Sequence, residues 1–255
     1  MDALIVTFNS ERELAGLAAC SAVMMGFDRT IIVDNCSTDQ TCAIARAAGM
    51  VVVEQDRNAG FGRAANIGAL YTRGAHFAVL NPDIRFTSSD DPDRLANHFE
   101  GTDVGLVGPR LVLPDGTAQD SARAIPSPAN LLLRRLTRRE HGAVNADLVC
   151  NVPWVVGGCV VIRRAAFDAV GGFDPRYFLY FEDVDLCLRL WEGGWTVRFD
   201  PSILVRHEHR AASRGRLWSP AARRHITSAV RFFLSHPRYL APRKHFLPRP
   251  SGRIQ

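Results

Sequence analysis

Short apolar runs alternate with stretches of helical periodicity in the first third of the chain, and this alternation limits the possible folds more than any other feature. Strands that alternate with helices predict βαβ units, a mainly parallel Rossmann-like sheet flanked by helices, and ligand sites at the carboxyl ends of the strands. The expected elements are strand 3–8, helix 11–25, strand 30–34, helix 41–48, strand 51–54, helix 60–72 and strand 77–80.

Polar residues follow three of these strands where each strand ends. For a single strand, turn and cap preferences of Asn, Asp and Ser explain such residues equally well. Three clusters that converge on one edge of a parallel sheet are less easily explained in this way, so we interpret them as a binding site. The residues are Thr7 and Asn9, then Asp34 and Asn35, then Asn81 and Asp83.

The second half has a different pattern, with short strands around one helix at 183–192. Mixed or antiparallel strands would extend the sheet there. Segment 126–149 has the composition of a loop and helix insertion, which is a common place for contacts with an acceptor. The expected strands are 105–107, 110–113, 155–162, 196–199 and 204–205.

The overall composition is that of a globular protein, because 47% of the 255 residues are hydrophobic and 22% are charged. This excludes a disordered or fibrous chain. The six cysteines form no CxxC pair, which favours buried free thiols in a reducing compartment over disulfides or a zinc site. We therefore expect a cytoplasmic protein. The weakly polar run 148–162 is too short and too rich in Gly and Pro to span a bilayer.

Positive charge is concentrated at the end of the chain. Segment 206–255 holds 12 of the 31 Lys and Arg residues but only Glu208 among the 26 acids, so its net charge is +11 and the rest carries −6. Aromatic and aliphatic residues are interleaved with these charges, and a second basic patch covers 131–139. The pattern indicates contact with an anionic membrane surface or an acidic partner, while a solvated helix face explains it equally well. Nucleic acid is not an expected partner.

Three carboxylates lie where the aromatic segment 177–181 leads into the helix at 183–192. Glu182 and Asp183 at a first helical turn can be caps that face the helix dipole. They can also be proton acceptors, because aromatic neighbours desolvate a carboxylate and raise its basicity. Asp185 is four residues before Arg189, which favours a structural ion pair.

The sequence has neither a GxGxxG fingerprint nor a GxxxxGK[ST] loop, so phosphates must be bound in another way. Asp83 is a candidate ligand for Mg²⁺ or Mn²⁺, ions that bridge diphosphate oxygens. His207 follows a strand and could add an imidazole ligand, which suits Mn²⁺ better than Mg²⁺. Considered alone, His207 is equally a structural histidine.

Several motifs occur in the order found in one enzyme family. The chain resembles a family-2 inverting glycosyltransferase of the GT-A fold, particularly the bacterial rhamnosyltransferase-like branch. The segments that carry the resemblance are Ile5–Asn9, Val33–Asp39, Arg57–Asn66, Leu80–Asp83, Gly157–Gly158, Gly172–Asp174, Phe181–Asp185 and His207.

The resemblance implies roles for the residues of a nucleotide-sugar site. Asp34 would accept a hydrogen bond from the pyrimidine ring, beside Thr7, Asn9 and Asn35. A loop and helix start over the donor would consist of Arg57, Asn58, Gly60 and Asn66. Asp83 takes the place of the last aspartate of the family's metal motif, Asn81 stands at its first acidic position, and His207 would complete the metal site.

The resemblance also implies a catalytic half. Asp183 would deprotonate the acceptor hydroxyl, with Glu182 beside it as an orienting neighbour or as an alternative base. Trp154, Gly157 and Gly158 would let the sugar or acceptor approach the backbone, although tight packing explains the glycines as well.

Three kinds of function follow from this pattern. The first is transfer of a sugar, expected to be rhamnose from dTDP-rhamnose, to a glycan or polyprenyl-linked acceptor at the inner face of the plasma membrane. A transferase for a UDP-sugar is the alternative within the same fold. The second kind of function is that of a degenerate nucleotide-sugar-binding adaptor, and the third is that of a sugar-phosphate nucleotidyltransferase. We expect a transferase domain at 1–210, with a donor half at 1–110 and an acceptor and catalytic half at 111–210, followed by a basic amphipathic region at 211–255.

Overall fold

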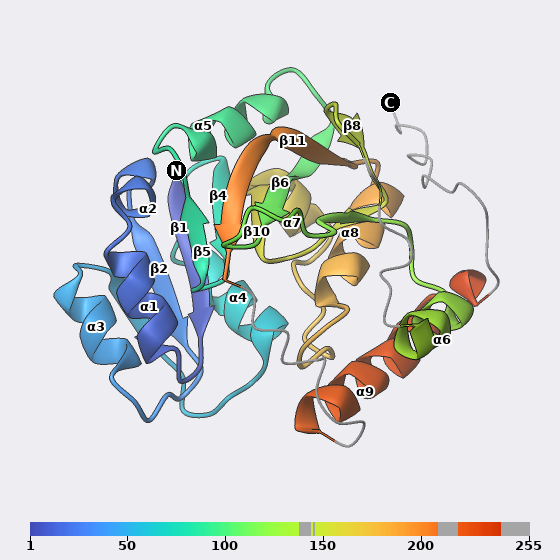
Figure 1. Ribbon diagram of the computed structural model, residues 1–255, viewed down its shortest axis with the longest axis horizontal. Coiled ribbons are helices and arrows are strands. Elements are labelled where there is room, and N and C mark those ends of the chain that lie inside the picture. Colours follow the sequence, from blue (N-terminus) through green and yellow to red (C-terminus); the bar gives the residue numbers. More distant parts are fainter. Residues whose placement is uncertain (138–143, 145, 209–218, 241–255) are drawn as a thin grey trace.

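The computed structural model of the protein describes residues 1–137, 144, 146–208 and 219–240 (Figure 1). Most of the basic segment 211–255 and the end of the basic patch 131–139 therefore lie outside the described residues. In the described part, strands pair in the order β3-β2-β1-β4-β10-β6-β11-β5, and β8 adds to β11. None of the helices found there is both long enough and apolar enough to cross a bilayer.

Four parallel strands form the first half of the sheet, as the alternation predicts. Alternate residues of β1 and β2 face two different layers of helices. Leu4 and Ile31 pack against α4, whereas Ile5 and Ile32 belong to the core under α1, α2 and α3. The elements are β1 (Asp2–Thr7), β2 (Thr30–Asp34), β3 (Val51–Glu54), β4 (His76–Leu80), α1 (Glu11–Ala18), α2 (Ser21–Gly26), α3 (Thr41–Ala47) and α4 (Phe61–Ala69).

The single helix expected at 11–25 is wrong, because the chain forms α1 and α2 with a break at Cys20, whose backbone is extended. In one straight helix, Val23 would point about 180° away from Leu14, since nine residues separate them. The break allows Leu14 and Val23 to enter the same core cluster.

Antiparallel pairing begins at β10 (Cys159–Arg163), which lies between β4 and β6 (Val104–Val112). The strand β11 (Thr196–His207) runs parallel to β6 and pairs with β5 (Ile84–Phe86) and β8 (Cys150–Asn151). A separate two-stranded sheet joins β7 (Ala122–Arg123) to β9 (Trp154–Val155). The expected antiparallel extension is thus present.

Strand boundaries in this half differ from the sequence prediction. Ranges 105–107 and 110–113 belong to one strand, and so do 196–199 and 204–205, because β11 continues through a register shift between Asp200 and Leu204. Pro201 lies inside this shift, where the ladder is interrupted and a missing backbone N–H costs little. The run 155–162 is instead divided into β9 and β10 by a turn that contains Gly157 and Gly158.

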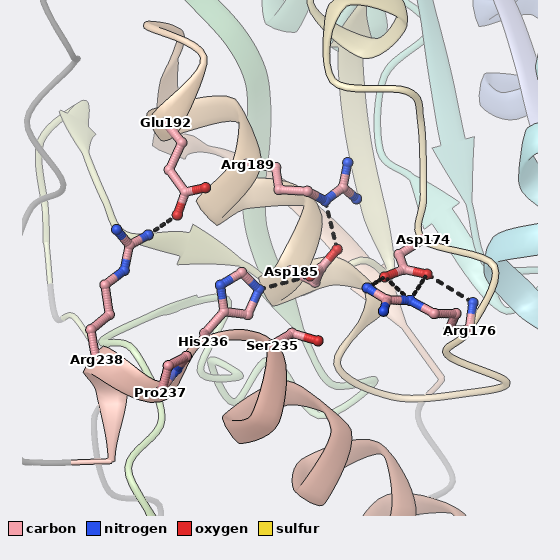
Figure 2. Close-up of a pocket in the computed structure, with 9 residues that line it drawn as sticks. All are labelled: Asp174, Arg176, Asp185, Arg189, Glu192, Ser235, His236, Pro237 and Arg238. Atoms are coloured by element: carbon pink, nitrogen blue, oxygen red, sulfur yellow. Dashed lines mark hydrogen bonds and ion pairs between the residues drawn. The ribbon is translucent and has the colours of Figure 1, made fainter.

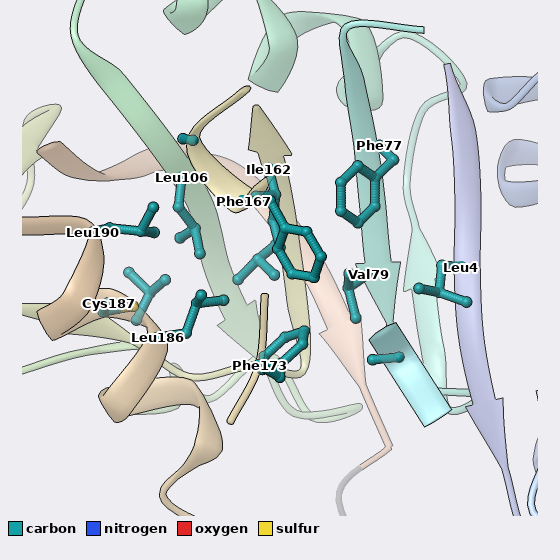
Figure 3. Close-up of a cluster of buried hydrophobic side chains, with 14 of the residues drawn as sticks. Leu4, Phe77, Val79, Leu106, Ile162, Phe167, Phe173, Leu186, Cys187 and Leu190 are labelled. Atoms are coloured by element: carbon teal, nitrogen blue, oxygen red, sulfur yellow. The ribbon is translucent and has the colours of Figure 1, made fainter. Parts of the chain in front are cut away.

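Helix α8 (Glu182–Glu192) is buried on two sides. Leu186, Cys187 and Leu190 pack into the main core with Phe173 (Figure 3). The opposite side enters a smaller cluster made of Tyr177, Phe181, Val184, Leu188, Phe232 and Tyr239.

Helix α9 (Pro220–Ser235) supplies Phe232 to this smaller cluster. The helix starts at Ser219, whose hydroxyl accepts a hydrogen bond from the Ala222 N–H, and Pro220 fits the first turn. In Figure 1, α9 and α6 (Pro128–Thr137) lie at the end of the molecule opposite α1 and α3. The remaining helices are α5 (Asp91–Ala96) and α7 (Arg164–Ala169).

All six cysteines are free thiols in the structure, in agreement with the prediction of no disulfide framework. Their burial varies more than expected, because Cys159 and Cys187 are buried whereas Cys36 is exposed.

Candidate active site

The end of β2 forms a polar cluster around the Asp34 carboxylate. Parallel register places Thr7 directly beside Asp34, and the Thr7 hydroxyl donates to Oδ1 at 2.8 Å. Ser37 donates its N–H to Oδ2 at 2.7 Å and its hydroxyl to Oδ1 at 2.5 Å. The Cys42 thiol is a further hydrogen-bond partner, and Asp34 is buried, so a ring N–H would have to share or replace one of these donors.

Asn9 closes this cluster from the end of β1. Its backbone has a φ of 49°, in the left-handed region that Asn tolerates better than most residues. Its N–H donates to the Ser37 hydroxyl at 2.8 Å, and its side-chain oxygen accepts from the Thr38 N–H at 2.9 Å. Thr7, Asn9 and Asp34 are therefore one connected group before any ligand binds.

Asn35 connects this strand end to the loop that precedes α4. Its side chain donates to the Gly60 carbonyl at 3.3 Å and accepts from the Ala59 N–H at 3.4 Å, while Asn58 accepts from the Gly60 N–H at 3.1 Å. Gly60 has a φ of +90°, and a Cβ at this position would lie 2.4 Å from the Phe178 carbonyl oxygen. A glycine is thus required here. Arg57, at the outer part of this loop, is exposed.

Asn66 has a different environment from the other candidate donor residues. Its side chain accepts from the Phe173 N–H at 2.8 Å and donates to the Phe173 carbonyl at 2.7 Å. These bonds tie α4 to a segment more than one hundred residues later in the chain, so Asn66 has a clear structural role. A donor-binding role for it stays a prediction.

The structure brings together the candidate metal residues Asp83 and His207. His207 Nε2 is 3.3 Å from Asp83 Oδ1 and 3.4 Å from Asn81 Nδ2. On the other side of the ring, Nδ1 is 2.9 Å from Gln119 Oε1, and Gln119 donates its amide to the His207 carbonyl at 3.3 Å. That second bond orients the amide, so Nδ1 carries the proton and donates.

The position of this proton determines which ring nitrogen faces Asp83, and hence whether Asp83 and His207 suit a divalent cation. With Nδ1 as the donor to Gln119, Nε2 faces the Asp83 carboxylate and the Asn81 amide, so an imidazole nitrogen and a carboxylate oxygen lie together as ligand types that Mn²⁺ accepts. A histidine whose second nitrogen donates to an oxygen is also the usual arrangement of a metal ligand. The residues therefore fit Mg²⁺ or Mn²⁺. No group of three or more Asp, Glu, His or Cys side chains suited to a metal occurs in the part of the chain that the structure describes.

Gly157 and Gly158 lie between the metal candidates and the candidate base. The Gly158 carbonyl accepts from the Asn81 N–H at 2.8 Å, and a Cβ on Gly158 would be 3.3 Å from His207 Cε1. The Gly157 N–H donates to Asp183 Oδ2 at 3.1 Å, and a Cβ on Gly157 would be 3.1 Å from Asp183 Cβ. Two adjacent glycines thus bring both groups to one place.

The Asp183 carboxylate is partly withdrawn from water, and this burial raises its pKa above the usual value for aspartate. Hydrogen bonds from the Gly157 and Val184 N–H groups and the charge of Arg123 oppose the shift. The Arg123 guanidinium lies 5.8 Å from the centroid of the Trp154 ring, and the Trp154 indole donates to the Ala124 carbonyl at 2.9 Å. The small sheet β7-β9 therefore positions a cation and an aromatic ring near the carboxylate.

Glu182 is more deeply buried than Asp183, with 7% of its surface exposed. Burial first, and then the neighbouring Asp183 charge, raise the pKa of Glu182 to about 8. Its Oε2 atom has no hydrogen-bond partner among the described residues. Phe181, directly before it, has a φ of 70°, and so does Tyr180. Two aromatic residues in the left-handed region indicate local strain at the entry to α8.

Asp185 points away from Asp183, since two residues correspond to about 200° around a helix. Arg189 donates to Asp185 Oδ2 at 2.8 Å, which confirms the expected ion pair, and His236 Nε2 is 2.9 Å from Oδ1 (Figure 2). A pocket of about 390 Å³ opens on this side of α8, lined by Asp174, Arg176, Asp185, Arg189, Glu192, Ser235, His236, Pro237 and Arg238. The charged side chains drawn there pair with one another, as in Glu192 with Arg238.

Sequence reasoning missed several residues that hold the site. Ser37 lies inside a recognised motif and could have been proposed as a partner of Asp34 three residues before it. Gln119, Arg123 and His236 had no such signal, because each reaches its partner across a large separation in sequence.

The sequence matches the model for glycosyl transferase family 2 over residues 2–171, and a model for glycosyl transferase family group 2 over residues 134–234. The chain belongs to glycosyl transferase family 2. It is 32% identical over 237 residues to N-acetylglucosaminyl-diphospho-decaprenol L-rhamnosyltransferase of Mycobacterium tuberculosis, covering 81% of this chain and 73% of that protein. It is 37% identical over 198 residues to rhamnosyltransferase WbbL of Escherichia coli, covering 72% and 73%.

Solved structures agree with this assignment at the level of the fold. GalNAc-T7 with UDP, GalNAc and Mn²⁺ superposes with a TM-score of 0.62 at 16% identity, covering 95% of this chain and 51% of that one. The Pyrobaculum calidifontis mannosyltransferase PcManGT, in complex with GDP-Man and Mn²⁺, gives a TM-score of 0.59 at 15% identity, covering 94% and 71%. The GT-A fold expected from the sequence is confirmed.

Proposed function

We propose that this family-2 glycosyltransferase transfers rhamnose from dTDP-rhamnose, with inversion, to a hydroxyl of a glycan or polyprenyl-linked acceptor in cell-surface polysaccharide synthesis. One observation carries the proposal. The desolvated Asp183 carboxylate lies across Gly157 and Gly158 from the Asp83 and His207 pair. This arrangement supports a proton acceptor on one side of the turn and a diphosphate-binding position on the other.

The choice of donor and acceptor rests on the relatives. Two proteins that are 32% and 37% identical over most of the chain are named as rhamnosyltransferases, and the first acts on a decaprenol-linked sugar according to its name. The solved structures with UDP or GDP-Man are below 25% identity and support the fold alone.

The donor would bind along the strand ends. Asp34 accepts a hydrogen bond from the pyrimidine ring N–H, with Thr7 and Ser37 fixing its orientation. The loop that contains Gly60 covers the donor and is held by Asn35. Asp83 and His207 would hold Mg²⁺ or Mn²⁺, which neutralises charge that develops on the departing diphosphate.

Asp183 acts as the general base. Its raised pKa makes the ionised carboxylate a better proton acceptor than an ordinary aspartate. It takes the proton of the acceptor hydroxyl while the oxygen attacks the anomeric carbon and the bond to the diphosphate breaks. One displacement from the opposite face inverts the configuration. Trp154, whose ring lies against Arg123, would contribute to binding of the acceptor.

Protection against thermal unfolding tests the donor. In the presence of Mn²⁺, dTDP-rhamnose should raise the Tm, and UDP-galactose or UDP-GlcNAc should do so less. Asp34→Asn should weaken protection, because an amide nitrogen facing the ring N–H replaces an acceptor by a donor. His207→Ala should lose Mn²⁺ binding measured by calorimetry without nucleotide. Protection by UDP-sugars alone would overturn the assignment of rhamnose.

A further inference from the structure

Helix α9 exposes a line of aliphatic side chains on its outer face. Ile226, Val230 and Leu234 have exposed fractions of 50%, 55% and 78%. Their spacing of four residues places them on one side of the helix. The other side is buried, since Phe232 packs in the cluster under α8 and Ser228 is enclosed. The helix is therefore apolar on two sides. Among the described residues, the cluster under α8 covers the side of Phe232, and the side of Ile226, Val230 and Leu234 is exposed.

The charge of this region is entirely positive. Between Ser219 and Leu240 the sequence contains no Asp or Glu. Arg223 is exposed and lies on the same face as Val230, seven residues later. The other arginines of this stretch contact the protein itself: Arg224 lies over the Phe178 ring, Arg231 donates to the Arg176 carbonyl and Arg238 pairs with Glu192.

We propose that this outer face of α9, defined by Arg223, Ile226, Val230 and Leu234, docks on an anionic phospholipid surface. Exposed aliphatic side chains beside a cationic side chain are a combination that lies at the headgroup boundary of a negatively charged bilayer. The inference extends the proposed transfer to a lipid-linked acceptor and rests on that function for its biological meaning. Its physical support is the geometry and charge of α9.

A second copy of this chain fits the face less well. A symmetric pair would bring Arg223 of both copies together, because the stretch itself contains no acid. Three partly exposed aliphatic side chains also offer far less than the roughly 800 Å² per partner that a stable protein interface buries. An anionic lipid surface accommodates both the positive charge and the small exposed apolar area.

The inner face of α9 connects this surface to the catalytic helix. The Ser228 hydroxyl donates to the Leu179 carbonyl at 2.8 Å, and the Phe232 ring lies 5.3 Å from the Phe181 ring. Both partners belong to the segment that leads into Glu182 and Asp183. A bilayer on the outer face of α9 would thus be separated by one helix from the element that carries the base.

Cosedimentation of the full chain with vesicles tests the proposal. Wild-type protein should bind vesicles of mixed phosphatidylglycerol and phosphatidylcholine, and added salt should weaken binding. The triple variant Ile226→Ser, Val230→Ser, Leu234→Ser should partition at least about tenfold less. Arg223→Gln should reduce binding by about three- to fivefold.

A matched control removes exposed apolar side chains elsewhere. Met25→Ser, Leu70→Ser, Leu148→Ser changes residues of 76%, 83% and 81% exposure outside α9 and should leave vesicle binding unchanged. Thermal unfolding and hydrolysis of the nucleotide-sugar in solution should be as in the wild type for both triple variants.

The outcomes separate the possibilities. Equal binding by wild type and α9 triple variant would overturn the proposal, as would equal binding to pure phosphatidylcholine. A wild-type dimer that the triple variant abolishes, with vesicle binding unaffected, would assign the face to a second copy instead. Vesicle binding without turnover of any nucleotide-sugar would reject the proposed function while the docking surface stands.

Discussion

The first turn of helix α8 places the same kind of side chain in two different environments. Glu182 and Asp183, which we call the reactive face, have pKa values raised by burial, and backbone N–H groups donate to Asp183. Asp185, which we call the paired face, is 2% exposed, and Arg189 and His236 contact its two oxygens. Carboxylates within one helical turn thus become reactive or structural according to what other elements place beside them.

Contacts on the paired face also hold in place the segment that leads into the reactive face. Tyr180 and Phe181 hold left-handed conformations that cost on the order of 1–3 kcal/mol each. The contacts of Ser228 and Phe232 with this segment, together with the His236 bond to Asp185, fix the entry to α8 from outside. If this comparison is correct, substitutions on the reactive face change rate, and substitutions on the paired face change stability.

The largest expected effect is on the reactive face. Asp183→Asn removes the proton acceptor but keeps the shape of the side chain, so the rate of glycosyl transfer should fall by about 10³-fold. Thermal unfolding should show an unchanged or higher Tm, because a neutral amide replaces a desolvated carboxylate. Asp168→Asn makes the same chemical change at an exposed position of α7 and should leave the rate unaltered. Wild-type transfer by Asp183→Asn would remove Asp183 from the mechanism.

Contacts that follow from a strand or helix pattern could be predicted from the sequence, and contacts between unrelated elements could not. The strand pattern placed Thr7 and Asp34 at neighbouring strand ends, and helical spacing joined Asp185 to Arg189. His236 reaches Asp185 from another helix, and no periodicity reports such a contact. The break between α1 and α2 was missed for a related reason, since the packing of Val23 overrides a continuous helical pattern.

The second prediction concerns the paired face. Asp185→Asn leaves Arg189 and His236 without their shared buried carboxylate, so the free energy of unfolding should fall by about 3 kcal/mol. Urea denaturation at neutral pH measures this loss. His236→Gln removes one contact and retains the Arg189 pair, so its loss should be nearer 1 kcal/mol. A stable but inactive Asp185→Asn protein would contradict the division between the two faces.

The smallest expected effect distinguishes the two carboxylates of the reactive face by the pH dependence of stability. Burial raises the pKa of Glu182 from 4.5 to about 8, so the folded protein holds this proton more tightly than the unfolded chain does. The free energy of unfolding should therefore decrease as pH rises from about 4.5 to about 8.

Glu182→Gln removes this dependence because glutamine stays neutral. Urea denaturation should show equal stability for variant and wild type near pH 4, and a higher stability of the variant at pH 9. Asp183 remains in the variant with its own raised pKa, and its charge contributes to the raised pKa of Glu182, so the difference between the two curves measures Glu182 together with its interaction with Asp183. A variant that is less stable than wild type at pH 9 would show that Glu182 is ionised and paired in the folded protein. Glu182 would then belong with Asp185 among the structural carboxylates, and Asp183 alone would remain on the reactive face.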